Sequence, residues 1–96
     1  MPPKKDFSPG QQELIKAFLS LKNNTEVRLF LNDILTPGEI EILVERWNLV
    51  KLLRQGKTQR EVSAILGIAI ATVSRGARQL KYGSRGFALI MKRMGL

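Results

Sequence analysis

The stretch from Thr58 to Gly76 constrains the fold more than any other part of the chain, because it holds a helix start, a helix end and a second start. Thr58 precedes Glu61 by three residues, the spacing of a capping box in which each side chain accepts the other residue's backbone N–H. Gly67 follows apolar residues at helical spacing, and glycine most easily takes the left-handed conformation that ends a helix. We therefore predict a helix-turn-helix over about residues 58–81.

The second helix of this pair has the side chains that a helix in the major groove of DNA needs. Small residues let a backbone approach the duplex, while hydroxyl and guanidinium groups meet base edges and phosphates. We expect Gln59 and Arg60 to hold the DNA backbone. The residues expected to face or approach the groove are Ala69, Ile70, Ala71, Thr72 and Ser74, and Arg78 on the same helix is expected to bind DNA as well.

A plainer interpretation of the same stretch is a pair of short helices that pack in a core. Apolar residues at helical spacing are usually core residues. The capped short helix, the glycine at the turn and the basic surroundings together favour the DNA-binding interpretation. In either case, the side chains expected to enter the core are Ile65, Leu66, Ile68, Ile70 and Val73.

Charge is distributed unevenly along the chain. Residues 1–45 carry five Lys/Arg and seven Asp/Glu, whereas residues 46–96 carry eleven and one. No acidic residue follows Glu61, so no carboxylate in this part of the sequence offsets the positive charge of the basic side chains. These side chains therefore attract a nearby polyanion. A membrane surface would attract the same charge. However, these residues flank a helix-turn-helix and do not line one face of a long amphipathic helix, so nucleic acid is the better partner.

Composition argues against several other classes of protein. The chain has no Cys and no His, which disfavours disulfides, an ordinary zinc site and imidazole catalysis. No nucleophile–base pair, metal cluster or phosphate-binding loop is recognisable, so we expect no catalytic residues, no metal site and no enzyme activity. The N-terminus lacks the apolar region of a signal peptide and no apolar run is long enough to span a bilayer, so we expect a cytoplasmic protein without membrane contact.

The order of helical patterns predicts an all-α fold with six helices. Residues 1–10 are rich in Pro and Lys and are expected to form a flexible basic arm, which either contacts DNA or has no role. Residues 11–96 are expected to form one helical domain. Besides the helix-turn-helix, we predict helices over about residues 11–22, from Thr25 as N-cap, from Pro37 to about Gln55 after a second capping box, and over about residues 87–94.

The second of these helices is apolar on nearly all sides. A helix of that kind must be buried, and a chain of 96 residues has few ways to bury it alone. Burial against a second copy of the same helices is the simplest arrangement. The sequence therefore predicts an obligate homodimer.

The chain also resembles the tryptophan operon repressor family over roughly residues 25–81. The resemblance implies an intertwined all-helical dimer in which L-tryptophan acts as corepressor and binds between the long helix and the recognition helix. The residues that carry the resemblance are Leu35-Thr36-Pro37, Glu39, Arg46, Leu53, Gly56, Gln59-Arg60-Glu61, Leu66-Gly67, Ile70-Ala71-Thr72, Arg75-Gly76 and Leu80-Lys81.

By the same resemblance, the corepressor-binding residues are Thr36, Arg46, Arg75 and Gly76. Two guanidinium planes can sandwich an indole, an arginine can pair with a carboxylate, and a threonine hydroxyl adds a hydrogen bond. In the alternative interpretation, Arg75 contacts phosphate and Arg46 pairs with a surface acid.

Two residues depart from the family pattern. Trp47 stands where relatives carry a smaller aliphatic residue, and it is a candidate to narrow or fill the pocket. Ser63 stands where the best-known repressors carry a lysine that contacts DNA, so operator sequence and affinity are expected to differ.

These observations lead to a tryptophan-responsive aporepressor that binds a pseudo-palindromic operator in double-stranded DNA. One alternative is a DNA-binding regulator of the same family that does not use tryptophan. The other is a basic interaction protein that docks an acidic partner, and it predicts an affinity for DNA that does not depend on sequence.

Overall fold

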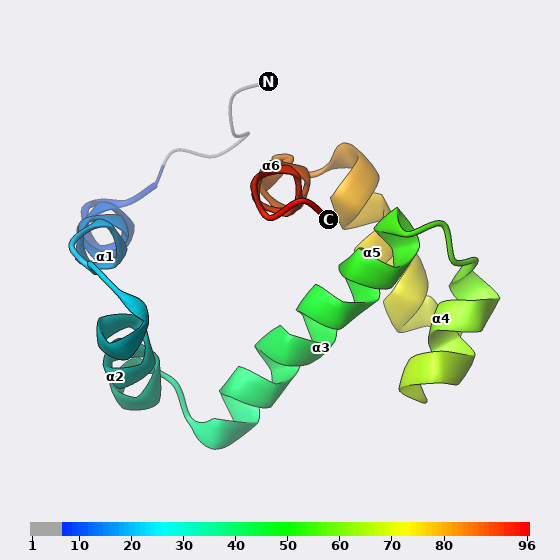
Figure 1. Ribbon diagram of the computed structural model, residues 1–96, viewed down its shortest axis with the longest axis horizontal. Helices are drawn as coiled ribbons and strands as arrows, with labels where there is room; N and C mark the ends of the chain where they lie inside the picture. The colour runs from blue at the N-terminus through cyan, green and yellow to red at the C-terminus, as the bar shows by residue number, and fades with distance from the viewer. Residues whose placement is uncertain (1–6) are drawn as a thin grey trace. The chain divides into compact units, whose positions relative to one another are not determined.

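A computed structural model of the chain describes residues 7–96 and contains only α-helices within that range (Figure 1). The prediction of an all-α fold with six helices is confirmed. Residues 1–6, which make up most of the predicted basic arm, lie outside the described residues. The helices are α1 (Pro9–Leu19), α2 (Asn24–Ile34), α3 (Pro37–Arg54), α4 (Gln59–Leu66), α5 (Ile70–Tyr82) and α6 (Gly86–Arg93).

Helix α1 begins two residues earlier than predicted, at Pro9. Ser8 and Gln11 form a capping box, in which the Gln11 N–H donates to Ser8 Oγ at 3.2 Å and the Ser8 N–H donates to Gln11 Oε1 at 2.8 Å. A proline in the first turn is no obstacle, since the N–H it lacks would have no partner within the helix. Pro9 and Gly10, expected in the arm, therefore belong to the helix.

Helix α2 is capped by Asn23 and not by Thr25 as predicted. The Asn23 side chain accepts a hydrogen bond from the Glu26 N–H at 3.0 Å, and Thr25 lies inside the first turn. Asparagine is at least as good an N-cap as threonine, and the cap of Asn23 draws two more residues into the helix. The predicted position of Glu26 in the first turn is confirmed.

The chain divides into two compact units, one that ends at Glu41 and one that runs from Ile42 to Leu96. In the first unit, α1 and α2 contact each other through Phe18 and Phe30, whose rings meet edge to face with centroids 5.1 Å apart. Neither helix has a buried residue. The large apolar side chains that remain exposed on them are Leu14, Ile15, Phe18, Leu19, Val27, Leu29 and Ile34.

The second unit contains the buried core. Helices α4, α5 and α6 gather around the C-terminal half of α3 (Figure 1). Half-buried apolar side chains, Trp47 and Phe87 among them, surround that core. Its buried residues come from all four helices and are Leu49, Val50, Val62, Val73 and Met91.

Two residues that were expected to enter the core are exposed. Ile65 is 56% exposed and Ile70 is 48% exposed. On the short helix α4, Val62 and Leu66 are four residues apart and share the inward face, so Ile65 falls outside that face. Ile70 is the first residue of α5 and precedes the part of that helix that packs inward.

Candidate functional site

Helices α4 and α5 form the predicted helix-turn-helix, and its local structure follows from the residues that suggested it. The Glu61 N–H donates to Thr58 Oγ1 at 3.1 Å, and the Thr58 N–H donates to Glu61 Oε1 at 2.9 Å. The hydrogen bond from the Thr58 N–H holds the pKa of the Glu61 carboxyl below its usual value, because it stabilises the charged form. Gly67 ends α4 with φ at +66°, as expected for a glycine at this turn.

The turn between α4 and α5 has a hydrogen bond of its own that sequence reasoning missed. The Ser63 hydroxyl donates to the Ile68 carbonyl oxygen at 2.6 Å, while the Gly67 and Ile68 N–H groups donate back to the Ser63 carbonyl. A lysine at this position has no hydroxyl group and could not form this hydrogen bond in the same way. Ser63 therefore stabilises the turn from within and is half buried.

The residues predicted to contact DNA lie mostly on the surface of this unit. Gln59, Arg60, Ala69, Ile70, Ala71 and Arg78 are exposed, whereas Thr72 and Ser74 are half buried. The N-cap of α5 makes no side-chain hydrogen bond, so the helix start is open to an incoming acceptor.

Two of the predicted DNA-contacting residues bond to each other across the motif. The Ser74 hydroxyl on α5 donates to Gln59 Oε1 on α4 at 2.7 Å. The amide N–H groups of Gln59 remain as donors. The bond thus ties the start of the first helix to the second helix of the motif and fixes the direction of the Gln59 side chain.

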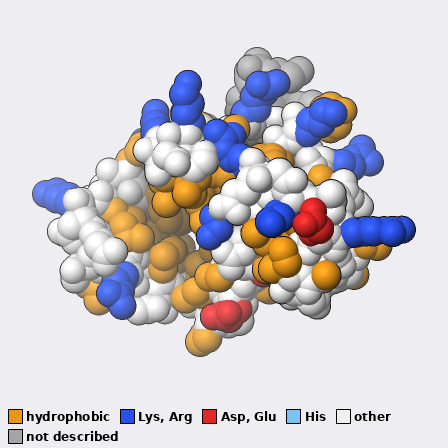
Figure 2. Space-filling model, turned by 45° about the vertical axis from the view of Figure 1, so that its right-hand side comes forward, with side chains coloured by type: hydrophobic (Ala, Val, Ile, Leu, Met, Phe, Trp, Pro, Cys, Tyr) orange, Lys and Arg blue, Asp and Glu red, His pale blue; other side chains and the backbone are white. Residues whose placement is uncertain are grey.

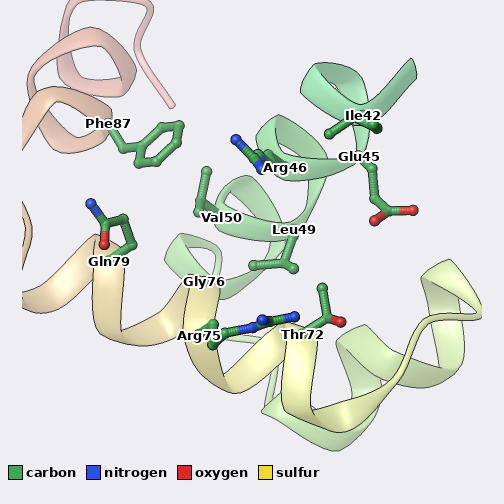
Figure 3. A pocket seen from close by; sticks show the side chains of 10 residues that line it. All are labelled: Ile42, Glu45, Arg46, Leu49, Val50, Thr72, Arg75, Gly76, Gln79 and Phe87. Carbon is green, nitrogen blue, oxygen red and sulfur yellow. The ribbon is translucent and has the colours of Figure 1, made fainter. Parts of the chain in front are cut away.

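A pocket of about 620 Å³ opens where α3, α5 and α6 face one another (Figure 3). Arg46 from α3 and Arg75 from α5 contribute guanidinium groups, and Phe87 from α6 contributes a ring. The lining residues are Ile42, Glu45, Arg46, Leu49, Val50, Thr72, Arg75, Gly76, Gln79 and Phe87.

Three of the four predicted corepressor-binding residues line this pocket, and the fourth, Thr36, belongs to the other compact unit. Arg46, Arg75 and Gly76 are among its lining residues. Thr36 instead caps α3, since its Oγ1 accepts the Glu39 N–H at 3.1 Å and its own N–H donates to Glu39 Oε1 at 2.8 Å. The predicted capping box at the start of the long helix is thereby confirmed.

Helix α5 packs closely against Leu49 of α3 at Gly76. A Cβ atom on Gly76 would overlap the Cδ2 atom of Leu49, which is only 3% exposed. A side chain at position 76 could therefore be accommodated only if Leu49 shifted. Thr72, Arg75 and Gln79 come from the same face of α5 at helical spacing and complete this wall of the pocket.

Trp47 does not line the pocket, contrary to the idea that it fills it. Its side chain is half buried and packs against the core of the second unit. The Trp47 ring lies 6.4 Å from the Phe87 ring, centroid to centroid, at an angle of 44°. Trp47 thus lies beside a residue that lines the pocket, and neighbouring Arg46 points to a different side of α3.

Four lining residues with polar or aromatic side chains were not predicted as ligand contacts from the sequence. They were either overlooked or given another role. Glu45 and Gln79 were not proposed as ligand contacts, and Thr72 was proposed only for DNA. Thr72 and Gln79 lie three and four residues from Arg75, and this helical spacing could have indicated them, whereas no such spacing relates Glu45 to Arg46. Phe87 follows a glycine-containing turn, and nothing in the sequence fixes the direction in which α6 returns.

Basic side chains spread over the face of the molecule shown in Figure 2, where acidic side chains are sparse. The lack of acidic residues beyond Glu61 accounts for this imbalance in the C-terminal unit. A surface of this kind attracts a polyanion over a distance of about 10 Å at 0.1 M salt. Among residues 7–96, no helix has the length and apolar character needed to cross a membrane.

Comparisons with known proteins agree with this arrangement. Residues 10–95 match the family described as Trp repressor protein. The chain is 40% identical over 78 residues to the Trp operon repressor homolog of Vibrio cholerae, an alignment that covers 78% of this chain and 73% of that protein. It is 33% identical over 82 residues to the uncharacterized protein YerC of Bacillus subtilis, covering 85% and 79%.

A solved structure extends the likeness to the fold. The crystal structure of a TrpR-like protein from Eubacterium eligens superimposes with a TM-score of 0.84 at 34% identity, and the match covers 93% of this chain and 92% of that one. The chain therefore belongs to the Trp repressor family of DNA-binding transcriptional regulators, which are not enzymes.

Proposed function

We propose that the protein is a homodimeric repressor that binds a pseudo-palindromic operator and uses L-tryptophan as its corepressor. The observation that carries the proposal is that α5, the expected reading helix, forms one wall of the pocket. Thr72, Arg75 and Gly76 line the pocket and also belong to the helix expected to enter the major groove. A ligand in the pocket would therefore contact the reading helix directly.

The pocket has groups that suit an aromatic amino acid. The guanidinium groups of Arg46 and Arg75 can pair with a carboxylate and stack on a π-system. Phe87, Leu49 and Val50 offer an apolar surface to an indole ring. The volume of about 620 Å³ is within the range of small-molecule sites.

DNA binding would use the exposed start of α5 and the basic side chains around it. The open N-terminus of α5 offers backbone N–H groups to a phosphate. Gln59, Arg60 and Arg78 would hold the DNA backbone, while Ala71 and Thr72 approach base edges. The recognition helices of the two subunits would then lie about 34 Å apart.

A second copy of the chain is the proposed cover for the apolar side chains of α1 and α2. These helices have no buried residue, and Leu19 and Leu29 are 78% and 62% exposed. Apolar surface of this extent on a protein of 96 residues favours association. Homodimerisation also matches the two-fold symmetry of a palindromic operator.

Ligand and DNA binding would be coupled through the position of α5. A tryptophan that contacts α3 and α5 together would favour one placement of α5 against α3. The ligand strengthens DNA binding only if its affinity is higher for the position of α5 that DNA also binds.

Calorimetric titration of the purified protein with L-tryptophan tests the ligand. We expect saturable binding that is lost in the Arg46→Ala variant and kept in Arg93→Ala, which removes an arginine outside the pocket. Absence of binding to the wild-type protein, together with no rise in its melting temperature, would favour a family member that does not respond to tryptophan.

A further inference from the structure

The end of α5 and the turn after it carry two exposed side chains that belong neither to the pocket nor to the core, Tyr82 and Arg85. We propose that these two residues bind the sugar–phosphate backbone of duplex DNA beside the groove that the start of α5 enters. The proposal rests on the proposed binding of DNA by α5 and adds to it a contact that is independent of base sequence.

Tyr82 belongs to an exposed stripe along α5. The stripe consists of Ala71, Arg75, Arg78 and Tyr82, which are all exposed and recur at intervals of three or four residues. Residues at this spacing lie on one face of a helix. Ala71 is expected to approach base edges and Arg78 to hold the DNA backbone, so Tyr82 continues the expected DNA-facing side toward the end of the helix.

The length of α5 carries Tyr82 beyond the base pairs that the helix start would meet. Ile70 and Tyr82 are the first and last of the 13 residues of α5, so they lie roughly 18 Å apart along the helix axis. The major groove of B-DNA is about 12 Å wide and about 8.5 Å deep. A helix that contacts bases with its N-terminal residues therefore has its last turn near the phosphates that border the groove.

The backbone of Arg85 has a conformation that favours glycine. Its φ is +66°, and Arg85 is the one residue other than glycine with a positive φ among residues 7–96. The left-handed conformation is less stable for arginine than for glycine, because a Cβ crowds the neighbouring carbonyl oxygen. Since Arg85 lies outside the core and the pocket, neither accounts for an arginine here. Residues in such conformations cluster at binding sites.

Gly83 sets the direction in which the chain leaves α5 toward Arg85. The Gly83 N–H donates to the Gln79 carbonyl oxygen at 2.9 Å. A Cβ on Gly83 would overlap that same oxygen, and a backbone atom cannot move aside as a flexible side chain can. The tight turn keeps Arg85 close to Tyr82 in the chain, with only Gly83 and Ser84 between them.

The chemistry of this surface suits phosphate. The Tyr82 side chain is 69% exposed, and Lys81 places its Nζ atom 5.3 Å from the centre of the Tyr82 ring. A tyrosine hydroxyl can donate a hydrogen bond to a phosphate oxygen, and a guanidinium group can donate two. A membrane surface also presents phosphate, but the continuous stripe from Ala71 to Tyr82 on the expected reading helix favours DNA.

The variant Arg85→Gly separates DNA binding from stability. Glycine suits a φ of +66°, so the melting temperature should equal or exceed that of the wild-type protein. Affinity for duplex DNA, followed by fluorescence anisotropy, should fall about three- to tenfold. The loss should be the same for a selected operator and a random duplex of equal length. The slope of log affinity against log salt should become shallower by about 1 for each half-site.

Three further variants test the assigned chemistry. Arg85→Lys keeps the charge and should recover part of the affinity that Arg85→Gly loses. Tyr82→Phe removes only an uncharged hydroxyl, so it should weaken binding about twofold or more without changing the salt slope. Arg93→Ala is the matched control, because it removes a positive charge at the opposite end of α6, and it should keep the wild-type slope.

Ethylation interference then locates the contact on DNA. We expect a phosphate whose ethylation weakens binding of the wild-type protein but not of Arg85→Gly. If Arg85→Gly has the affinity and salt slope of the wild-type protein, the inference is wrong while DNA binding by α5 stands. A loss confined to the selected operator would also contradict it, because it would place Arg85 at a base edge. If the wild-type protein binds no duplex, the proposed function fails as well.

Discussion

Gly76 on α5 and Leu49 on α3 meet so closely that a single methyl group on Gly76 would overlap the Leu49 side chain. Both residues also line the pocket. The contact between the reading helix α5 and the long helix α3 is thus part of the pocket wall. A substitution at this contact therefore also changes the pocket.

Substitution of Gly76 should therefore destabilise the protein despite the higher helix propensity of alanine. The buried Leu49 side chain would have to shift out of its packed position to accept the new methyl group, so we expect Gly76→Ala to lower the free energy of unfolding by about 1–3 kcal/mol. Urea unfolding measures the change. Gly10→Ala is the matched control, because a Cβ on Gly10 meets no atom within 4 Å.

The double variant Gly76→Ala, Leu49→Ala checks the assigned contact. The smaller side chain at position 49 makes room for the new methyl group, so the second substitution should cost less in the Gly76→Ala background than in the wild-type protein. Additive effects of the two substitutions would contradict the steric explanation.

The bond between Ser74 and Gln59 should couple the two helices of the reading motif. In a double-mutant cycle with Ser74→Ala and Gln59→Ala, we expect a coupling free energy of unfolding of about 0.5–1 kcal/mol, typical of one hydrogen bond near the surface. Both single variants should also weaken DNA binding, because each leaves the other side chain without its partner. A coupling energy of zero would show that the bond does not persist in solution.

The capping box of α4 should make stability depend on pH. The pKa of Glu61 is below its ordinary value of 4.5, chiefly because its carboxylate accepts the Thr58 N–H. A carboxyl whose pKa is lowered by folding stabilises the protein above its unfolded pKa, and that stabilisation is lost as the pH falls through its folded pKa.

Melting temperatures measured between about pH 5 and pH 3 test this dependence. Glu61→Gln keeps a side-chain acceptor for the Thr58 N–H but has no charge to titrate, so its melting temperature should fall less steeply in this range than that of the wild-type protein. Glu41→Gln serves as the control. Identical pH profiles for Glu61→Gln and the wild-type protein would count against the assigned hydrogen bond.

Arg78 should act on DNA through phosphate and not through base sequence. It is exposed on α5, beyond the residues that approach the groove. Arg78→Ala should weaken binding to all DNA sequences about equally and lower the slope of log affinity against log salt by about 1. A loss confined to one DNA sequence would instead place Arg78 at a base edge.

The helix boundaries that sequence predicted well are those set by local chemistry. Thr36 with Glu39 and Thr58 with Glu61 begin helices where expected, and Gly67 ends one. Each of these signals depends on residues at most a few positions apart. Where two local signals compete, as at Asn23 and Thr25, the sequence alone does not decide between them.

The pocket could be predicted only in part, because it depends on how distant helices meet. Arg46, Arg75 and Gly76, which the family resemblance named together, line one pocket, while their binding of a corepressor stays a prediction. The direction of α6 decides that Phe87 lines the pocket, and no local pattern specifies that direction. The inward position of Trp47 likewise depends on tertiary packing.

The most direct test of the account measures DNA affinity with and without L-tryptophan. Operator sequences are first selected from a random DNA pool with the ligand present, and binding of the best sequence is then followed by fluorescence anisotropy. We predict that saturating L-tryptophan tightens binding by about tenfold or more, within the usual range of allosteric coupling, and that Arg46→Ala abolishes this effect. Equal affinity with and without L-tryptophan would contradict the proposed coupling between the pocket and α5.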